Sequence, residues 1–252
     1  MRIVVIGHGM VGHRFVEVLA RDAAALHLNT PLDVTVLAEE NRPAYDRVQL
    51  SAYFSGKTAE DLSLVDPHFF DESGFKLHLG QAAASIDRAA KIVTTKGGEQ
   101  IPYDKLVLAT GSYPFVPPVK GNDREECLVY RTIEDLEAMK TSATRSKIGV
   151  VVGGGLLGLE AAKALRDLGL QTHVVEFAPR LMAVQIDDGA GKLLRSKIES
   201  LGVGVHLGKN TTEIVDGEAC RHRMNFADGS HLETDMILFS AGIRPRDELA
   251  RS

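Results

Sequence analysis

Tryptophan is absent from this 252-residue chain, and cysteine is nearly absent. The two cysteines, Cys127 and Cys220, are 93 positions apart, so they form neither a CxxC pair nor a cluster with metal-ligand spacing. A four-cysteine iron–sulfur cluster therefore cannot be built from this chain alone. We expect both residues to be free thiols, as is usual for proteins of a reducing compartment.

The chain also lacks a basic excess, with 29 Lys and Arg against 34 Asp and Glu and a net charge of −5. Nucleic-acid-binding proteins usually carry a basic excess, so this balance argues against nucleic acid as a partner. No apolar run reaches the roughly 18–20 residues of a membrane span. The amino terminus leads directly into a strand-like segment, without the apolar stretch and cleavage site of a signal peptide. These features predict a cytoplasmic protein without a membrane partner.

Signatures of hydrolytic and metal chemistry are missing too. The chain has no HExxH string and no arrangement of Ser, His and acid that is typical of a hydrolase. Its nine histidines are dispersed, and His206, His222 and His231 fall in strand or loop contexts. We expect surface or core positions for these histidines and no metal site.

Glycine, in contrast, is plentiful, and part of it is concentrated in two matching places. Residues 3–20 read IVVIGHGMVGHRFVEVLA and residues 150–165 read VVVGGGLLGLEAAKAL. Each segment has a β-branched run, a glycine cluster and then an apolar pattern of helical period. Gly7 and Gly153 are 146 residues apart, far more than the roughly 20–50 residues of a solenoid repeat. The pattern indicates a duplicated supersecondary unit, in a chain long enough for one large domain or two ordinary ones.

The alternation of apolar strands with helical patterns predicts an α/β fold with parallel sheets and crossover helices. A small strand set with a Gly97-Gly98 turn is expected over 75–79, 83–86, 91–95 and 100–102. The proline-rich segment 112–121 predicts a domain boundary. The other expected strands are 3–6, 34–37, 106–109, 150–152, 172–176, 203–207, 213–215, 223–226 and 236–240, and the expected helices are 10–21, 132–139, 157–168 and 187–200, with a connector at 23–32.

The first glycine cluster, GHGMVG, follows a predicted strand and opens a predicted helix, which is the context of a dinucleotide fingerprint. In that context Gly7 permits the tight turn, Gly9 lets the backbone approach a pyrophosphate, and Gly12 lets the helix pack closely on the strand. The helix amino terminus offers unpaired N–H groups to the phosphates. Glu39 follows the second strand and can bind ribose hydroxyls, although it lies 27 residues after Gly12 where roughly 20 is usual.

The second cluster, GGGLLG, repeats this arrangement with Gly153, Gly155 and Gly158. Glu176 ends the following strand, 18 residues after Gly158, which is close to the expected spacing. An acid at this position favours the ribose hydroxyls of NADH and repels the additional phosphate of NADPH, which needs a nearby arginine. Arg180 is close in sequence, so NADPH remains the alternative to NADH.

Two dinucleotide loops in one chain imply two dinucleotides. FAD and NAD(P)H are the economical pair, because flavin and nicotinamide react with each other by hydride transfer.

Longer strings support a resemblance to the pyridine nucleotide–disulfide oxidoreductase family, of glutathione-reductase-like fold. Its marks are GHGMVG, LVLATGSYP at 106–114, GGGLLGLEAA and ILFSAGIRP at 237–245. More specific strings, RPAYDRVQLSAYF at 42–54, VYRTIEDL at 129–136 and THVVEFAPRLM at 172–182, resemble the N-terminal FAD/NAD(P)-binding module of assimilatory NAD(P)H nitrite reductase large subunits. The resemblance covers essentially the whole chain.

The resemblance implies roles for individual residues in holding FAD. The implied pyrophosphate contacts are Gly7, Gly9, Met10, Val11 and Gly12; the others are Glu39 at the adenosine ribose, Ala83 at the adenine, Arg47 beside the flavin cofactor, Thr110 and Gly111 near the flavin, and Arg131 on its phosphate side. Related reductases have a lysine where this chain has Ala52, which leaves the partner of flavin N5 open.

For NADH, the resemblance implies contacts from the second loop and from the carboxyl end of the chain. The implied residues are Gly153, Gly155, Leu156, Leu157 and Gly158 at the pyrophosphate, Glu176 at the ribose, Glu160 beside the nicotinamide as the catalytic residue, and Gly242 where the chain passes the cofactor.

The resemblance also implies a domain organisation of two Rossmann-like dinucleotide-binding domains. Residues 1–115 are expected to form the first part of an FAD-binding domain, 116–241 an inserted NAD(P)H-binding domain, and 242–252 the start of a segment that returns to the FAD domain. In related proteins that segment continues and carries an acid at the flavin, whereas this chain stops seven residues after Pro245. We therefore expect a fragment in which the C-terminal part of the FAD domain is missing.

The implied function is transfer of hydride from NADH to FAD, with electrons passing onward to sirohaem and 4Fe-4S centres that are not in this chain. The segment 40–60 contains no cysteine, so the thiol relay of disulfide reductases is excluded. Two alternatives remain: a ferredoxin- or rubredoxin-type reductase of the same fold, and a non-catalytic nucleotide-binding fragment that no longer holds FAD. The sequence also leaves open whether the chain forms a homodimer.

Overall fold

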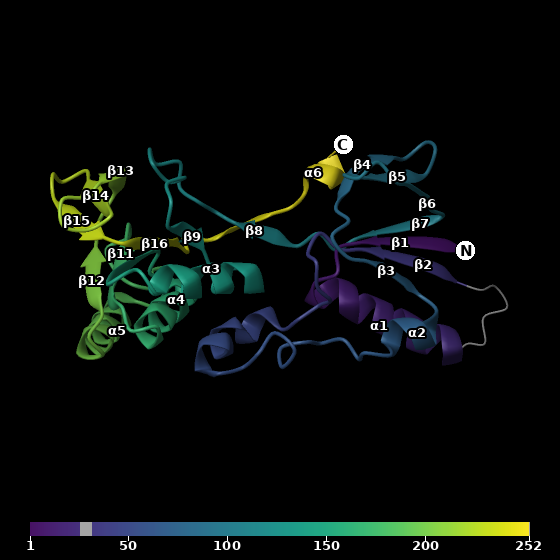
Figure 1. The fold of residues 1–252 in the computed structure, drawn as a ribbon, viewed down its shortest axis with the longest axis horizontal. Coiled ribbons are helices and arrows are strands. Elements are labelled where there is room, and N and C mark those ends of the chain that lie inside the picture. The colour runs from purple at the N-terminus through teal and green to yellow at the C-terminus, as the bar shows by residue number, and fades with distance from the viewer. Residues whose placement is uncertain (26–31, 252) are drawn as a thin grey trace. The chain divides into compact units, whose positions relative to one another are not determined.

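The computed structural model describes residues 1–25 and 32–251, and the chain divides into two compact units. Unit 1 comprises Met1–Gln49, Thr58–Ser112 and Pro245–Ser252, and unit 2 comprises Leu50–Lys57 and Tyr113–Arg244. Each unit is built around its own parallel β-sheet (Figure 1).

The sheet of unit 1 has the strand order β3-β2-β1-β7, and all of its pairs are parallel. Helices lie on one face of this sheet, and a three-stranded antiparallel sheet lies on the other (Figure 1). The bounds are β1 (Arg2–Ile6), α1 (Met10–Ala25), β2 (Asp33–Leu37), α2 (Phe69–Ser73), β3 (Lys76–His78), β4 (Ala83–Asp87), β5 (Ile92–Thr95), β6 (Gln100–Pro102) and β7 (Lys105–Leu108).

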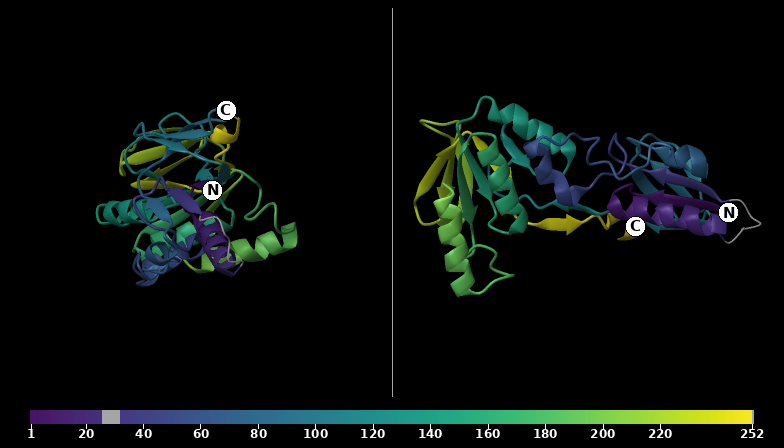
Figure 2. Two further views of the ribbon diagram at one scale, coloured as in Figure 1. Left: turned by 90° about the vertical axis from the view of Figure 1, so that its right-hand side faces the viewer. Right: turned by 90° about the horizontal axis from the view of Figure 1, so that it is seen from below.

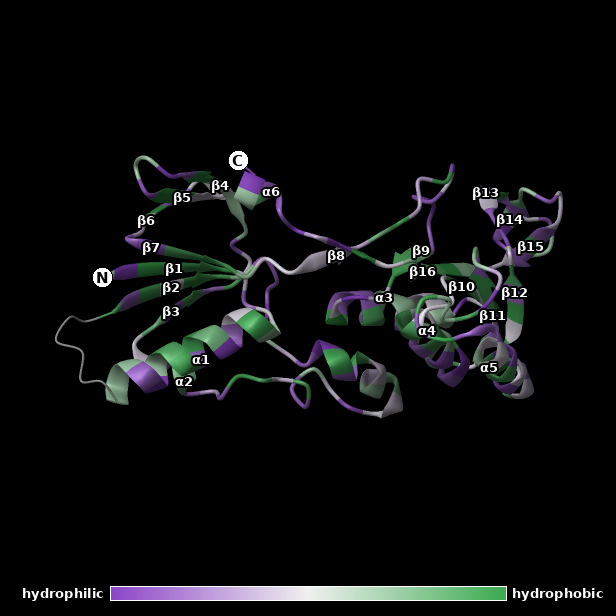
Figure 3. Ribbon diagram, turned by 180° about the vertical axis from the view of Figure 1, so that it is seen from behind, coloured by the Kyte–Doolittle hydropathy of each residue, from purple (hydrophilic) through white to green (hydrophobic). Residues whose placement is uncertain are grey.

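Strand β1 shows why this sheet is covered on both faces. Successive side chains of a strand point to opposite faces. Ile3 and Val5 accordingly pack with Val16 of α1, whereas Val4 and Ile6 pack with the antiparallel sheet. After the exposed Arg2, the strand therefore has no polar face and is a continuous apolar run, as buried parallel strands are (Figure 3).

Unit 2 repeats this layering. Its parallel sheet has the order β12-β11-β10-β16-β9, with α3 packed on β9, α4 on β10 and β11, and α5 on β12 (Figure 2). The antiparallel sheet β13-β14-β15 packs on the parallel sheet through Ile214, Met224 and Phe226. The bounds are β9 (Cys127–Val129), α3 (Ile133–Ala143), β10 (Ile148–Val152), α4 (Leu156–Asp167), β11 (Gln171–Glu176), α5 (Asp188–Ser200), β12 (Gly204–Leu207), β13 (Thr211–Asp216), β14 (His222–Phe226), β15 (His231–Thr234) and β16 (Met236–Phe239).

Four short elements complete the described chain. The 3-10 helix η1 (Arg47–Ser55) lies between β2 and α2 in the sequence, and α6 (Glu248–Arg251) follows the last strand. Strands β8 (Ser112–Pro114) and β17 (Ile243–Pro245) pair with each other.

The predicted α/β fold is confirmed, and two helices of unit 2 begin with a side-chain cap. Thr132 caps α3 in a reciprocal capping box with Asp135, and Asp187 caps α5 by accepting a hydrogen bond from the Ala190 N–H. One assignment was wrong: residues 76–78 pair in parallel with β2 instead of joining the small antiparallel set. Strands β8, β9, β15 and β17 were missed, because three or four residues are too short to show a period. Of the expected connector at 23–32, residues 23–25 belong to α1 instead, and residues 26–31 lie outside the described residues.

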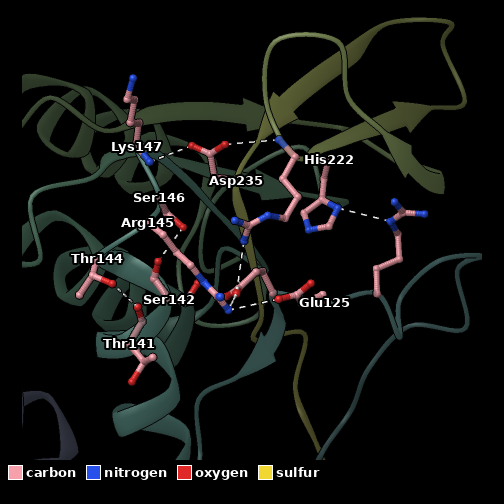
Figure 4. Close-up of polar contacts among 12 residues, drawn as sticks. Glu125, Thr141, Ser142, Thr144, Arg145, Ser146, Lys147, His222 and Asp235 are labelled. Carbon is pink, nitrogen blue, oxygen red and sulfur yellow. Dashed lines mark hydrogen bonds and ion pairs between the residues drawn. The ribbon is translucent and has the colours of Figure 1, made fainter.

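A polar cluster fixes the amino-terminal edge of the unit 2 sheet (Figure 4). The Asp235 carboxylate accepts hydrogen bonds from the backbone N–H groups of Lys147 at 2.8 Å, Ile148 at 3.1 Å and Arg221 at 3.3 Å. Burial acts to raise the pKa of Asp235, but these three donors outweigh burial and the pKa is lowered. Asp235 therefore joins the α3–β10 turn to the start of β14.

Replacing Asp235 with alanine is expected to lower the free energy of unfolding by about 2 kcal/mol, because hydrogen bonds to a carboxylate are lost together. Urea denaturation measures the change. Glu199→Ala is the matched control, because it removes only an exposed pair with Arg195 on α5 and should cost at most about 0.5 kcal/mol. Equal effects of the two substitutions would contradict the role given to Asp235.

Candidate functional site

The second glycine loop joins β10 to α4 in unit 2. Of the three glycines of its fingerprint, two have no room for a Cβ atom and one has. A Cβ on Gly153, whose φ is +123°, would lie 2.3 Å from the Ser240 carbonyl oxygen. A Cβ on Gly158 would lie 1.9 Å from the Gly153 carbonyl oxygen. A Cβ on Gly155 would meet nothing within 4 Å. The outer glycines are therefore required by the protein's own packing, whereas the middle glycine leaves space in front of the helix.

That space opens into a cavity of about 670 Å³ at the carboxyl ends of the unit 2 strands. Most of the expected NADH contacts line this cavity: Gly153, Gly155, Leu156, Leu157, Glu176 and Gly242. Gly158 instead packs under the loop. Glu160 is half-buried on α4, one turn after Leu156, and burial raises the pKa of its carboxyl group.

Glu176 is held at the end of β11 by two backbone donors. Its carboxylate accepts hydrogen bonds from the N–H of Gly154 and from the N–H of Ala178, the latter at 2.7 Å. Anchored in this way, it lines the cavity as a fixed negative charge.

The cations near Glu176 are already engaged by other groups. The Arg180 guanidinium donates to the carbonyl oxygens of Ile186 and Ala183 and pairs with Asp188, so it fixes the loop before α5. Lys209 lines the cavity, but its ammonium group binds Asp228 and the Ser230 hydroxyl. Arg180, which the sequence left as a candidate for a 2′-phosphate, therefore has a structural role.

The first glycine loop in unit 1 shows the same division. A Cβ on Gly7, whose φ is +110°, would lie 2.1 Å from the Ala109 carbonyl oxygen, and a Cβ on Gly12 would lie 2.0 Å from that of Gly7. A Cβ on Gly9 would meet nothing within 4 Å. Met10 and Val11 form the first turn of α1 beside this open position, and the Val11 side chain is exposed.

A cavity of about 340 Å³ lies at the carboxyl ends of the unit 1 strands and contains four of the expected FAD contacts, namely Gly7, Glu39, Ala83 and Thr110. Two cations that the sequence did not single out, Lys96 and Arg246, also line it. Arg246 forms an ion pair with Glu39, and Lys96 approaches the same carboxylate at 3.5 Å. Sequence reasoning missed both because they lie 57 and 207 residues from Glu39.

The segment after β17 is attached directly to the expected flavin-side residues. The Arg246 backbone N–H donates to the Gly111 carbonyl oxygen at 2.9 Å, and the Thr110 hydroxyl donates to the Arg246 carbonyl oxygen at 2.6 Å. These two bonds fix the position from which the Arg246 side chain reaches Glu39.

The two expected flavin-side arginines are differently placed. The Arg47 guanidinium pairs with Glu40 and lies 4.7 Å from the centre of the Tyr45 ring. Arg131 donates its backbone N–H to Asp135 and lines the unit 2 cavity. Their roles at FAD stay predictions.

His8, the residue between Gly7 and Gly9, is a feature of the site that the sequence reading missed. Its side chain is buried, its Nδ1 accepts a hydrogen bond from the Ala44 N–H at 3.2 Å, and the rings of His13 and Phe70 contact it edge-on. Burial, with the adjacent His13, lowers the pKa of His8 from 6.5 to about 4. The first glycine loop therefore contains a buried imidazole that is neutral near pH 7.

Unit 1 is expected to lose stability as the pH falls from about 6.5 to about 4. Over that interval the unfolded chain protonates His8 while the folded chain does not, so the folded state loses on the order of 3 kcal/mol. Thermal unfolding followed across this range measures the loss. His8→Asn keeps an acceptor for the Ala44 N–H without titrating, and should reduce the pH dependence. An unchanged pH dependence in that variant would assign it to other groups, such as His13.

Two strand–glycine loop–helix units, each with an acid at the end of the next strand or just after it, define the dinucleotide-binding oxidoreductase class of α/β proteins. A family model described as pyridine nucleotide-disulphide oxidoreductase matches residues 1–252, and the chain belongs to this family. The chain is 57% identical over 251 residues to the large subunit of NADH nitrite reductase of Escherichia coli (strain K12), covering 99% of this chain and 29% of that protein.

Other similarities agree with this assignment. The chain is 35% identical over 253 residues to an assimilatory nitrate reductase electron transfer subunit of Bacillus subtilis (strain 168), covering 100% of this chain and 32% of that protein. The structure of a NAD-dependent persulfide reductase from A. fulgidus superposes with a TM-score of 0.90 at 26% identity, covering all of this chain and 47% of that one.

The chain spans under a third of the length of these two curated relatives. Over the part of the chain that the structure describes, no helix combines the length and apolarity needed to cross a bilayer.

Proposed function

We propose that this chain is the NADH- and FAD-binding oxidoreductase module of an assimilatory nitrite reductase, and that it delivers electrons to sirohaem and iron–sulfur centres outside it. The observation that carries the proposal is the duplicated loop geometry. In each unit the backbone leaves no room for a Cβ atom at the first and third glycines, whereas the middle glycine faces open space at a helix amino terminus. Such a terminus binds a pyrophosphate through backbone N–H groups and the helix dipole.

Unit 1 fits FAD. Gly7, Gly9, Met10, Val11 and Gly12 would hold the pyrophosphate, Ala83 would lie at the adenine, and Thr110 and Gly111 near the flavin; Glu39 would take the adenosine ribose and Arg47 a position beside the flavin. Bound FAD would supply a hydride acceptor that can release electrons one at a time. Arg246 and Lys96 both pair with Glu39, so the ribose would meet a carboxylate that is already held in place.

Unit 2 fits NADH. Its loop would hold the pyrophosphate, Glu176 would accept hydrogen bonds from the ribose hydroxyls, and Glu160 would lie beside the nicotinamide. The fixed charge of Glu176 and the engagement of Arg180 favour NADH over NADPH. Hydride transfer needs no proton from the protein, so the chain's contribution is orientation and electrostatics.

We assign the domains as residues 1–115 for the first part of the FAD domain, 116–241 for the NADH domain, and 242–252 for the beginning of the return to the FAD domain. The contacts of Arg246 with Gly111, Thr110 and Glu39 support the last assignment, because they attach this segment to the proposed FAD site.

The proposed division of labour can be tested with artificial and natural acceptors. The FAD-loaded chain should reduce ferricyanide with NADH, because ferricyanide takes electrons directly from a flavin. It should not reduce nitrite, since the proposal places the sirohaem and iron–sulfur centres elsewhere. Nitrite reduction by this chain alone would overturn the proposal.

A further inference from the structure

The order of the strands in unit 2 indicates which nucleoside of NADH each end of the cavity would hold. The Gly153–Gly155 loop leaves β10, the middle strand of β12-β11-β10-β16-β9, so a bound pyrophosphate lies at the centre of the sheet edge. Glu176, at the end of β11 on one side, takes the adenosine ribose. The second nucleoside must then lie on the other side, over the ends of β16 and β9. Neighbouring strands are about 4.8 Å apart, so β9 ends roughly 14 Å from β11.

Tyr130 is the residue that follows β9 at this second end. It lines the cavity, yet only 6% of its surface is exposed. Its hydroxyl is buried and makes no hydrogen bond of accepted geometry to any described residue. The Ser51 hydroxyl lies close enough to lower the pKa of the phenol and the Glu160 carboxylate to raise it, but neither makes a well-aligned hydrogen bond with the hydroxyl.

A buried hydroxyl without a hydrogen bond lowers the stability of a protein by about 1–3 kcal/mol relative to a satisfied one. Phenylalanine would fill the same space without that penalty. Burial and the nearby Glu160 raise the pKa of Tyr130, so the phenol remains a donor across the physiological range. A buried polar group that is costly in the free protein, on a residue that lines a binding cavity, is typical of a ligand contact.

We propose that the Tyr130 hydroxyl donates a hydrogen bond to the carboxamide oxygen of the nicotinamide, and so positions the ring at the β9 end of the cavity. The inference rests on the proposed binding of NADH by unit 2. Tyr130 thereby distinguishes a dinucleotide that carries a nicotinamide from one that lacks it.

The test compares Tyr130→Phe with the parent chain in calorimetric titrations with NADH and with ADP-ribose, which shares the pyrophosphate and both riboses but has no nicotinamide. We expect Tyr130→Phe to weaken NADH binding about 3- to 10-fold, as the loss of one neutral hydrogen bond predicts, and to leave ADP-ribose binding unchanged. The thermal unfolding midpoint should stay the same or rise. Tyr113→Phe is the matched control, because the exposed Tyr113 of β8 does not line the cavity.

The outcomes separate the two proposals. Equal weakening of both ligands, or a lower unfolding midpoint, would make the phenol a structural group and overturn this inference alone. Unchanged NADH binding would also overturn it alone. If the parent chain binds neither NADH nor ADP-ribose, both this inference and the proposed function of unit 2 fail.

Discussion

Gly155→Val is expected to weaken NADH binding on the order of 100-fold or more without destabilising the chain. Gly155 is the N-cap of α4 with φ −79°, a conformation open to any residue, and a Cβ there meets no protein atom within 4 Å. The added side chain would occupy the volume of the pyrophosphate and deny it the backbone N–H groups. Each hydrogen bond to a charged group contributes about 1.5–3 kcal/mol. Fluorescence titration with NADH gives the affinity, and thermal unfolding gives the stability.

Gly158→Ala is the informative comparison. Its Cβ would lie 1.9 Å from the Gly153 carbonyl oxygen, so the helix must shift and the unfolding free energy should fall by about 1–3 kcal/mol. We expect Gly155→Val to lose NADH binding with intact stability, and Gly158→Ala to lose stability. Tight NADH binding by Gly155→Val would show that the pyrophosphate does not lie in this loop.

Glu176→Ala should have the second-largest effect, a loss of NADH affinity of about 10- to 100-fold. The hydrogen bonds from the ribose hydroxyls to a carboxylate are lost, at about 1.5–3 kcal/mol. Repulsion of a 2′-phosphate is lost at the same time, so the ratio of NADH to NADPH affinity should fall. Parallel titrations with the two nucleotides measure both changes.

Glu199→Ala again serves as the control, because it removes an exposed carboxylate of α5 that does not line the cavity. It should leave both affinities unchanged. If Glu176→Ala kept the NADH affinity of the parent, the ribose contact assigned to Glu176 would be wrong.

The parts of the fold that the sequence predicted are those with local signals. The two strand–glycine loop–helix units follow from residues within a few positions of each other. The pairing partners of strands do not follow from such local signals. Strand β3 pairs in parallel with β2 through Lys76, Leu77 and His78, and nothing in its own composition distinguishes that pairing from an antiparallel one.

The same distinction holds for the site. Glycines and terminal acids could be located because their spacing is fixed by the turn and the strand. Long-range packing brings Arg246 to Glu39 and Tyr130 to the unit 2 cavity. The burial of His8 depends on contact with α2, more than 60 residues away. These residues carry no motif of their own, so only the folded chain reveals them.

The most direct test of the central claim is an anaerobic absorbance titration of the FAD-reconstituted chain with NADH. We expect uptake of one FAD per chain and loss of the yellow flavin absorbance as NADH is added, with Gly155→Val requiring far more NADH for the same change. A chain that takes up no FAD, or whose bound flavin stays oxidised in excess NADH, would contradict it.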